Sequence, residues 1–282
     1  MPAFDKNFLA SVFYVYPSKD DAKNSAESGG TGFLFGIQSD VAPNLWFTYA
    51  VTCWHVIRNH PNPVIRINTR DGKYDTIETK SDDWIRHPNG DDGAILRLSF
   101  GAKHNYLYGQ FTLDHLVTDE LIKTLSVSPG DEVVMIGRFR VHAGRKKNIP
   151  AFMFGYISMM PDEPIYNPET DLEQDSYLVE MRSISGFSGS PVILWIPPLS
   201  PRPTSTDLTY TSYIRLIGVC WGYIKVPERA EDDFGQKYKL KLNSAMAAVV
   251  PIQKVMDLIN SEEQVRARKE EDAVLKKNIE GA

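Results

Sequence analysis

The sequence contains little cysteine and no long apolar stretch. Only two cysteines, Cys53 and Cys220, occur among 282 residues, and they lie far apart. Secreted domains are often cross-linked by several disulfides. We therefore expect the protein to reside in a reducing compartment, the cytoplasm, and to contain no disulfide. No segment approaches the roughly 20 apolar residues of a membrane span. Residues 1–7 lack the apolar core of a secretory signal, and we therefore expect no membrane association.

An excess of positive charge and the common metal-binding motifs are also absent. The net charge is -5, whereas nucleic-acid-binding domains are normally basic, so we expect no nucleic-acid partner. There is no His-Glu-x-x-His segment and no Cys-x-x-Cys pair, the spacings typical of zinc sites. We predict neither a metal nor a cofactor. The composition itself, 42% hydrophobic and 24% charged, is typical of a globular protein with a substantial core.

Strand-like segments dominate the chain. Short runs rich in β-branched and aromatic residues recur between turns rich in Gly, Pro and Asp, a pattern that predicts a barrel or sandwich. These runs are residues 32–37, 46–52, 64–68, 94–98, 132–137, 152–157, 177–181, 191–196 and 214–221. A helical segment at residues 113–125 divides the strands into two sets and is expected to connect two β units. Residues 17–30 are polar and Gly/Ser-rich, which indicates a loop.

The C-terminal region has a helical pattern. Pro251 stands where the first turn of a helix tolerates proline, and Val255, Leu258 and Ile259 form one apolar stripe. Residues 262–280 are dense in Glu, Lys and Arg, with a thin apolar stripe. This segment is either a solvated helix or a helix that binds a partner or a second copy of the chain.

The most informative segment is residues 186–191, Gly-Phe-Ser-Gly-Ser-Pro. Small residues around Ser188 let the backbone turn tightly and expose one hydroxyl, and the N–H groups of such a turn can hold a developing oxyanion. A serine hydroxyl becomes a nucleophile at neutral pH only beside a base that a third group orients. Ser190 and Ser185 are the alternative hydroxyls.

One histidine and a pair of aspartates are candidates for the base and the orienting group. His55 lies within segment 49–57, at the end of an apolar strand, whereas the other five histidines have the polar or Pro/Gly-rich surroundings of exposed or structural residues. Asp91 and Asp92 directly precede an apolar strand. An acid at this position is either a turn residue or the buried partner of a base.

At these residues the chain resembles the trypsin/chymotrypsin-like serine proteases. Residues 52–55 (Thr-Cys-Trp-His), 92–96 (Asp-Gly-Ala-Ile-Leu) and 186–191 match the Thr-Ala-Ala-His, Asp-x-Ala-Leu-Leu and Gly-x-Ser-Gly-Gly-Pro segments of that family. The order His, Asp, Ser is that of chymotrypsin, which disfavours an esterase of another fold. Residues 218–223 resemble the family's Gly-Ile-Val-Ser-Trp-Gly strand, whose backbone pairs with the substrate.

The resemblance implies an all-β fold, with two six-stranded antiparallel Greek-key β-barrels and a C-terminal helix. His55 and Asp92 would lie on the first barrel and Ser188 on the second. The expected domain limits are 1–115 for the first barrel, 116–130 for the connection, 131–250 for the second barrel and 251–282 for the helical extension.

The resemblance also implies the activity of a serine endopeptidase that acts on proteins or peptides through an acyl-enzyme. Ser188 would be the nucleophile, His55 the general base and acid, and Asp92 the group that fixes the imidazole. Asp92 is preferred to Asp91 because the acid of the family stands two residues before a small residue, here Ala94.

Further positions of the family's site correspond to residues here. The backbone N–H groups of Gly186 and Ser188 would form the oxyanion hole. Arg182 stands six positions before the nucleophile, where the family has the floor of its specificity pocket, and would favour an acidic side chain before the cut. Three residues of the substrate-pairing strand are expected to bind substrate: Cys220, Trp221 and Gly222.

Phe187 departs from the secreted trypsin-like enzymes. Those have an aspartate there that pairs with a newly cleaved N-terminal amine, and phenylalanine cannot form that ion pair. We therefore expect an HtrA-like or intracellular bacterial type, controlled by loop ordering, by a regulatory partner or by self-association through residues 251–282. The alternative is a latent or non-catalytic protease-fold module that binds peptides or partner proteins, although the intact Ser, His and Asp set favours an enzyme.

Overall fold

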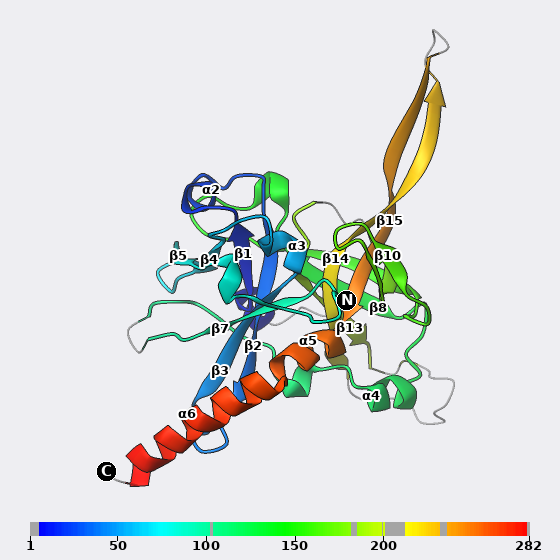
Figure 1. Cartoon of the computed structure of the whole chain (residues 1–282). Coiled ribbons are helices and arrows are strands. Elements are labelled where there is room, and N and C mark those ends of the chain that lie inside the picture. Colours follow the sequence, from blue (N-terminus) through cyan, green and yellow to red (C-terminus); the bar gives the residue numbers. More distant parts are fainter. Residues whose placement is uncertain are drawn as a thin grey trace.

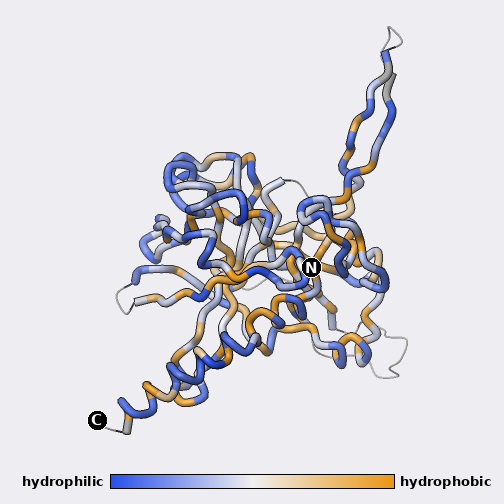
Figure 2. The backbone as a smooth tube through the Cα atoms, viewed as in Figure 1, coloured by the Kyte–Doolittle hydropathy of each residue, from blue (hydrophilic) through white to orange (hydrophobic). Residues whose placement is uncertain are grey.

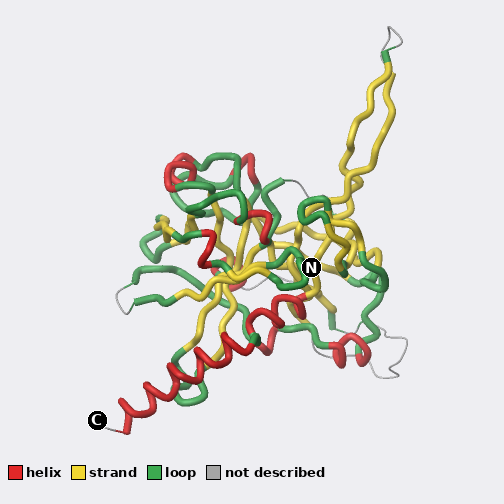
Figure 3. The backbone as a smooth tube through the Cα atoms, viewed as in Figure 1, coloured by secondary structure: helices red, strands yellow, loops and turns green. Residues whose placement is uncertain are grey.

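The computed structural model describes residues 6–101, 104–181, 185–198, 200, 212–231 and 236–280. Two β units lie side by side, and helices follow the last strand (Figures 1 and 3). The predicted all-β class with a C-terminal helix is confirmed. Arg182 lies outside the described residues, so the structure does not test its predicted role in specificity.

The first β unit is an antiparallel sheet of seven strands in the order β5-β4-β1-β2-β3-β7-β6. Its elements are α1 (Lys6–Ala10), β1 (Val12–Tyr16), α2 (Lys19–Asn24), β2 (Gly30–Gln38), β3 (Trp46–Thr52), α3 (Trp54–Ile57), β4 (Val64–Asn68), β5 (Tyr74–Glu78), the 3-10 helix η1 (Ser81–Asp83), β6 (Ile85–Arg86) and β7 (Ala94–Leu98). This unit is a half-barrel rather than the six-stranded closed barrel that we expected.

The second β unit is a closed barrel of six strands in the order β12-β15-β14-β13-β8-β9. Its elements are β8 (Glu132–Gly137), β9 (Ala151–Met159), β12 (Tyr177–Glu180), β13 (Ser190–Ile196), β14 (Tyr213–Glu231) and β15 (Lys237–Pro251). A separate ribbon pairs β10 (Ile165–Asn167) with β11 (Leu172–Gln174). The remaining elements are η2 (Leu113–His115), α4 (Asp119–Thr124), η3 (Arg140–His142), α5 (Ile252–Ile259) and α6 (Glu262–Glu280).

Two local expectations were wrong in detail. The expected helix at residues 113–125 is divided into η2 and α4, because Leu116 is extended and Thr118 begins a new helix by accepting a hydrogen bond from the Leu121 amide at 3.1 Å. The expected loop at residues 17–30 contains the helix α2, whose start Ser18 caps through the Asp21 amide at 3.1 Å. Capping residues of this kind lower the cost of starting a short helix.

The two β units share a hydrophobic core. Phe33 and Val51 of the half-barrel belong to the same buried cluster as Ile136 and Ile193 of the closed barrel. Hydrophobic residues accordingly lie where the units meet, while many residues of the outward loops are hydrophilic (Figure 2). The buried face of α5 also joins this cluster through Val255. Because apolar packing fixes one unit against the other, side chains at their junction are held at defined positions.

Helix α6 extends away from the barrel along the half-barrel (Figure 1). Asp272 is buried and accepts a hydrogen bond from the Ser39 hydroxyl at 2.5 Å. Arg268 donates to the Tyr49 hydroxyl at 2.7 Å. Beyond these contacts Val274 and Ile279 are exposed. Over the part of the chain that the structure describes, no helix is long and apolar enough to cross a membrane.

Strands β14 and β15 continue past the barrel as a two-stranded arm (Figure 1). We call this segment, residues 224–231 with 237–244, the arm. Its described register runs from Lys225 opposite Asn243 to Glu231 opposite Lys237. The side chains at the centre of both strands of the arm are exposed.

Candidate active site

The pairing of β3 with β7 brings His55 and Asp92 together. Thr52, the last residue of β3, lies opposite Ala94, the first residue of β7. His55 follows Thr52 in the short helix α3, and Asp92 stands just before Ala94. Antiparallel register therefore places two residues that are far apart in sequence at the same end of one strand pair.

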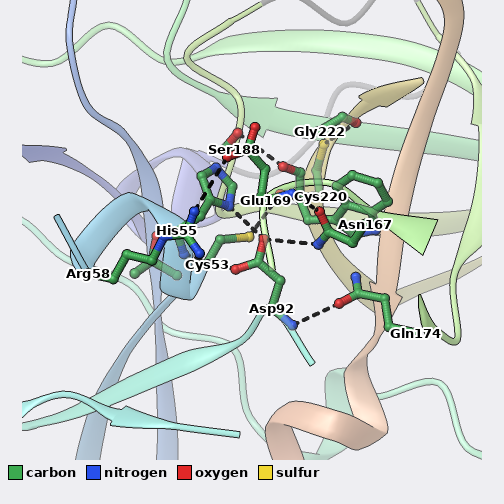
Figure 4. A network of polar contacts seen from close by, with 12 residues as sticks. Cys53, His55, Arg58, Asp92, Asn167, Glu169, Gln174, Ser188, Cys220 and Gly222 are labelled. Atoms are coloured by element: carbon green, nitrogen blue, oxygen red, sulfur yellow. Dashed lines mark hydrogen bonds and ion pairs between the residues drawn. The ribbon is translucent and has the colours of Figure 1, made fainter. Parts of the chain in front are cut away.

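The Asp92 carboxylate holds the His55 residue by two hydrogen bonds. The imidazole Nδ1 lies 2.6 Å from Oδ2, and the His55 backbone N–H donates to Oδ1 at 2.9 Å. Asp92 is fully buried, and Figure 4 shows its side chain near that of His55. A carboxylate on Nδ1 selects the tautomer whose Nε2 can accept a proton, so the ring is oriented for general-base chemistry.

The neighbouring carboxylate has a different set of partners. Asp91 lies 2.9 Å from Nδ1 of His87 and 3.4 Å from Nζ of Lys254, and it makes no contact with His55. Lys254 also pairs with Asp175 at 3.1 Å. Of the two aspartates, Asp92 contacts His55, whereas Asp91 pairs with Lys254 of helix α5.

Two opposing effects determine the pKa of His55. Burial of the imidazole lowers its pKa, whereas the charge of Asp92 and the hydrogen bond to it raise the pKa. Glu169 adds to the increase and Arg58 opposes it. The net result is a pKa above the usual value of 6.5, because an adjacent carboxylate favours the imidazolium.

Ser188 lies beside His55 at the junction of the two β units (Figure 4). Both residues line a cleft of about 640 Å³. The Ser188 hydroxyl donates to the Trp221 carbonyl at 3.2 Å, and among the described contacts no hydrogen bond joins it to the imidazole. Hydrogen bonds between catalytic groups are often loose without substrate and tighten when substrate binds.

The turn that carries Ser188 depends on two glycines. Gly186 has φ +107° and Gly189 has φ +86°, values that side chains other than glycine rarely adopt. A Cβ on Gly189 would stand 2.0 Å from the Thr31 carbonyl oxygen. The turn therefore needs glycine at this position both for its backbone angle and for its close approach to β2.

Thr31 of β2 bonds to this turn at several points. Its N–H donates to the Ser188 carbonyl at 2.8 Å, and its hydroxyl donates to the Gly186 carbonyl at 2.8 Å. The same hydroxyl accepts from the Arg138 amide at 2.9 Å. Ser188 makes no backbone N–H hydrogen bond to any described residue, and this N–H is available to an oxyanion.

Sequence reasoning missed the ribbon that contacts Asp92. Asn167 of β10 donates to Asp92 Oδ2 at 3.4 Å, and the Asp92 amide donates to Gln174 Oε1 of β11 at 2.9 Å (Figure 4). Both ribbon residues are buried. No sequence signal could have identified them, because an isolated Asn or Gln in a polar segment is typical of any loop.

The three residues that we expected to bind substrate adjoin the serine. The Cys220 carbonyl accepts from the Gly189 amide at 2.7 Å. The Trp221 indole donates to the Ser176 hydroxyl at 3.0 Å. Trp221 and Gly222 line the cleft, whereas the Cys220 side chain is buried in the core of the closed barrel. Of the three residues, Trp221 and Gly222 are thus positioned to contact a ligand directly.

The other two hydroxyls that the sequence offered have different environments. Ser190 is fully buried in β13. Ser185 is exposed and lines the cleft. Phe187, next to the serine, is fully buried and packs in the core of the closed barrel. A buried phenylalanine fills this position with apolar contacts instead of an ion pair.

In the described part of the chain, Cys53, His55 and Asp92 form a cluster of three residues that could share a metal ion. Their ligand atoms lie within 4.8 Å of one another. Burial and the charge of Asp92 raise the pKa of the Cys53 thiol well above its usual value of 9.0. A thiol in this state is a poor metal ligand, and it donates instead to the Cys220 carbonyl at 3.3 Å.

The sequence and fold place the chain in a known class. The model of the trypsin-like peptidase domain matches residues 30–194, more than half of the chain, and the protein belongs to this family. A search of curated proteins found no match.

Two solved structures are similar to this chain. The MamO protease domain from Magnetospirillum magneticum, in its apo form, is similar over 90% of this chain and 98% of that one, with a TM-score of 0.50 and 15% identity. The inactive form of the Rv3671c protease, a protein of M. tuberculosis H37Rv, covers 89% of this chain and 87% of its own, with a TM-score of 0.45 and 17% identity. The predicted chymotrypsin-like fold is confirmed.

Proposed function

We propose that the protein is a serine endopeptidase that uses Ser188, His55 and Asp92 as a catalytic triad. The observation that carries this proposal is the 2.6 Å contact of Asp92 with His55 Nδ1, at the wall of a cleft that Ser188 also lines. Membership of the trypsin-like peptidase family supports the same chemistry.

The mechanism follows from these positions. Ser188 Oγ attacks the carbonyl carbon of the scissile bond, and its proton passes to His55 Nε2. The resulting oxyanion accepts hydrogen bonds from the Gly186 and Ser188 amides, each worth about 3 kcal/mol in the transition state. The C–N bond then breaks as His55 returns the proton to the leaving amine. Water, deprotonated by the same histidine, releases the acyl group from Ser188.

The alternative is a latent or non-catalytic module that binds peptides. The hydrogen bond of Ser188 to the Trp221 carbonyl favours this alternative, because a hydroxyl held there must rotate before it can reach the imidazole. The Phe187 position argues against activation by an N-terminal amine in either case. We also propose that activity is controlled by a partner or by self-association through residues 251–282, and that the protein is cytoplasmic. The domain limits at 115, 130 and 250 are proposed as well.

A fluorophosphonate probe, which modifies only activated serines, separates the two functions. We expect the wild-type protein to be labelled and to cleave unfolded protein substrates, and Ser188→Ala to lose both properties. Ser185→Ala is the matched control, because Ser185 lines the same cleft and its loss should leave labelling intact. Folded wild-type protein that resists the probe would favour the latent module.

A further inference from the structure

The arm leaves one edge of β14 open beside the catalytic serine. Up to Cys220, β14 pairs with β13 on one side and β15 on the other. From Trp221 onward its described partners all belong to β15. On the opposite edge of β14 no strand of the described residues pairs with it from Trp221 outward. The Trp221 carbonyl accepts from the Ser188 hydroxyl and the Gly222 carbonyl from the Cys220 thiol, and a strand edge of this kind is a template for an added strand.

The two faces of the arm differ in chemistry. Cross-strand neighbours share a face, and the pairs Lys225 with Asn243 and Pro227 with Lys241 belong to one of them. Lys225, Pro227 and Lys241 all line the cleft. Arg229 and Lys239 form the next pair outward on this face. We call it the basic face.

The opposite face of the arm is largely apolar. Val226 pairs with Leu242 there, and Leu240 lies opposite Glu228. None of these side chains lines the cleft. The alternation of the two strands thus directs basic groups toward the catalytic side of the arm and aliphatic groups away from it.

At its end near the cleft, the basic face carries positive charge, whereas Glu231, opposite Lys237, shares the register of this face at the far end of the arm. Neither Lys225 nor Lys241 forms an ion pair with a carboxylate of the described residues, and the Lys225 ammonium lies 5.4 Å from the centre of the Tyr223 ring. Glu169 is the carboxylate that lines the same cleft, and it faces Arg58 at 3.9 Å. This local excess of positive charge contrasts with the net charge of -5 of the whole chain. A positive surface of this kind favours acidic ligands.

The direction of a bound peptide follows from the sheet. Every pairing of β14 with its neighbouring strands is antiparallel. A peptide that continues this pattern, with its scissile carbonyl at Ser188, runs with its N-terminal part along the arm. At about 3.4 Å per residue, Lys225 and Lys241 meet side chains about four to seven residues before the cut. Pro227 offers no N–H, so it interrupts the edge and limits the backbone pairing.

Pairing of β14 with the substrate segment upstream of the scissile bond is what the family resemblance implies, and we propose that Lys225 and Lys241 of the arm select acidic side chains in that segment. This inference rests on the proposed endopeptidase function. The added strand also completes the arm, because an isolated two-stranded hairpin is marginally stable in water and a third strand stabilises it.

The test begins with cleavage sites in a digest of an unfolded proteome, compared between the wild type and Ser188→Ala. We expect Asp and Glu to be enriched four to seven residues before the Ser188-dependent cuts. Two synthetic peptides that share one such cut, with either Glu or Gln upstream, then give a preference ratio in kcat/KM. We expect a ratio of about ten for the wild type, decreasing with salt.

Charge reversal assigns the preference to the arm. The double variant Lys225→Glu/Lys241→Glu should bring the ratio to one or below, whereas Lys80→Glu, an exposed lysine of the half-barrel, should keep the wild-type ratio. A labelled, cleaving enzyme without upstream acidic preference, or a preference that survives the reversal, would overturn the inference. Absence of any labelling or cleavage defeats the proposed function instead. In that case fluorescence anisotropy of the labelled peptides measures binding. Tighter binding of the Glu peptide than of the Gln peptide, abolished by the charge reversal, supports acidic selection by the basic face. Equal binding of the two peptides refutes it.

Discussion

Thr31 is one of the residues that hold the turn carrying Ser188. Its buried hydroxyl donates to the Gly186 carbonyl and accepts from the Arg138 amide. A buried backbone group that loses its partner costs about 1–3 kcal/mol. The hydroxyl therefore contributes to stability and to the geometry of the oxyanion site through the same two bonds.

Thr31→Val should consequently weaken both properties. Valine has nearly the same shape but no hydroxyl, and we expect the free energy of unfolding to fall by about 2 kcal/mol and fluorophosphonate labelling to slow. Urea denaturation and labelling rates measure the two effects. Thr31→Ser keeps the hydroxyl and should be labelled at nearly the wild-type rate. Labelling of Thr31→Val at the wild-type rate would show that the turn keeps its shape without this hydroxyl.

The raised pKa of His55 predicts the pH dependence of activity. The imidazole must be neutral to accept the serine proton, so activity is lost as the pH falls through the raised pKa, and the acid limb of kcat/KM should lie above pH 6.5. Glu169 raises this pKa and Arg58 lowers it. Glu169→Gln should therefore move the limb to lower pH and Arg58→Gln to higher pH. Shifts in the same direction in both variants would contradict this origin.

The three residues of the proposed triad were chosen from the sequence, but the residues that contact them could not be. His55, Asp92 and Ser188 each stand in a local segment whose small and apolar neighbours have a definite spacing. Asn167 and Thr31 act through contacts made across long stretches of chain, and no local pattern distinguishes them from other polar residues. The resting bond of Ser188 to Trp221 also depends on tertiary placement alone.

At the scale of elements, Asp91 connects the half-barrel to helix α5. Burial raises the pKa of Asp91, whereas the hydrogen bond from His87 and the charge of Lys254 lower it more strongly, so the net pKa lies below 3.8. A carboxyl whose pKa falls on folding stabilises the protein above its unfolded pKa, and this contribution is lost as the pH falls through the folded value.

Asp91→Asn should destabilise the protein by about 1–3 kcal/mol at neutral pH, because it leaves His87 and Lys254 without their shared carboxylate. The difference from the wild type should shrink below about pH 4, where the native carboxyl is itself being neutralised. Guanidinium denaturation of both proteins, at neutral pH and below pH 4, measures the two differences in the free energy of unfolding. A difference that stays constant across the range would exclude a contribution from the charge.

Element boundaries were harder to predict than element types. The alternating apolar segments gave the strands of both units, since burial of one face requires that alternation. The break between η2 and α4 arises from Leu116, which extends to pair with Leu216. The half-barrel and the length of the arm likewise depend on which strands pair, a non-local property that periodicity does not encode.

At the scale of the whole molecule, the arm stands outside the core. The residues of 227–241 that the structure describes contribute no buried hydrophobic side chain. Replacing this segment by an Asn-Gly turn between Val226 and Leu242, which lie opposite each other, fits a two-residue hairpin. We expect the Tm to change by less than about 3 °C, as measured by circular dichroism. A larger fall would mean that the arm supports the barrel.

The turn that carries Ser188 is held by residues that lie far apart in the sequence, one before it and one after it. The Thr31 amide fixes it from one side and the Cys220 carbonyl from the other. While the polypeptide emerges from the ribosome, Ser188 is present before Cys220 has been made, and its turn has no fixed shape. Under the proposed function, the order of synthesis acts as a safeguard, since a nascent chain carries the serine but not the geometry with which it would attack its neighbours.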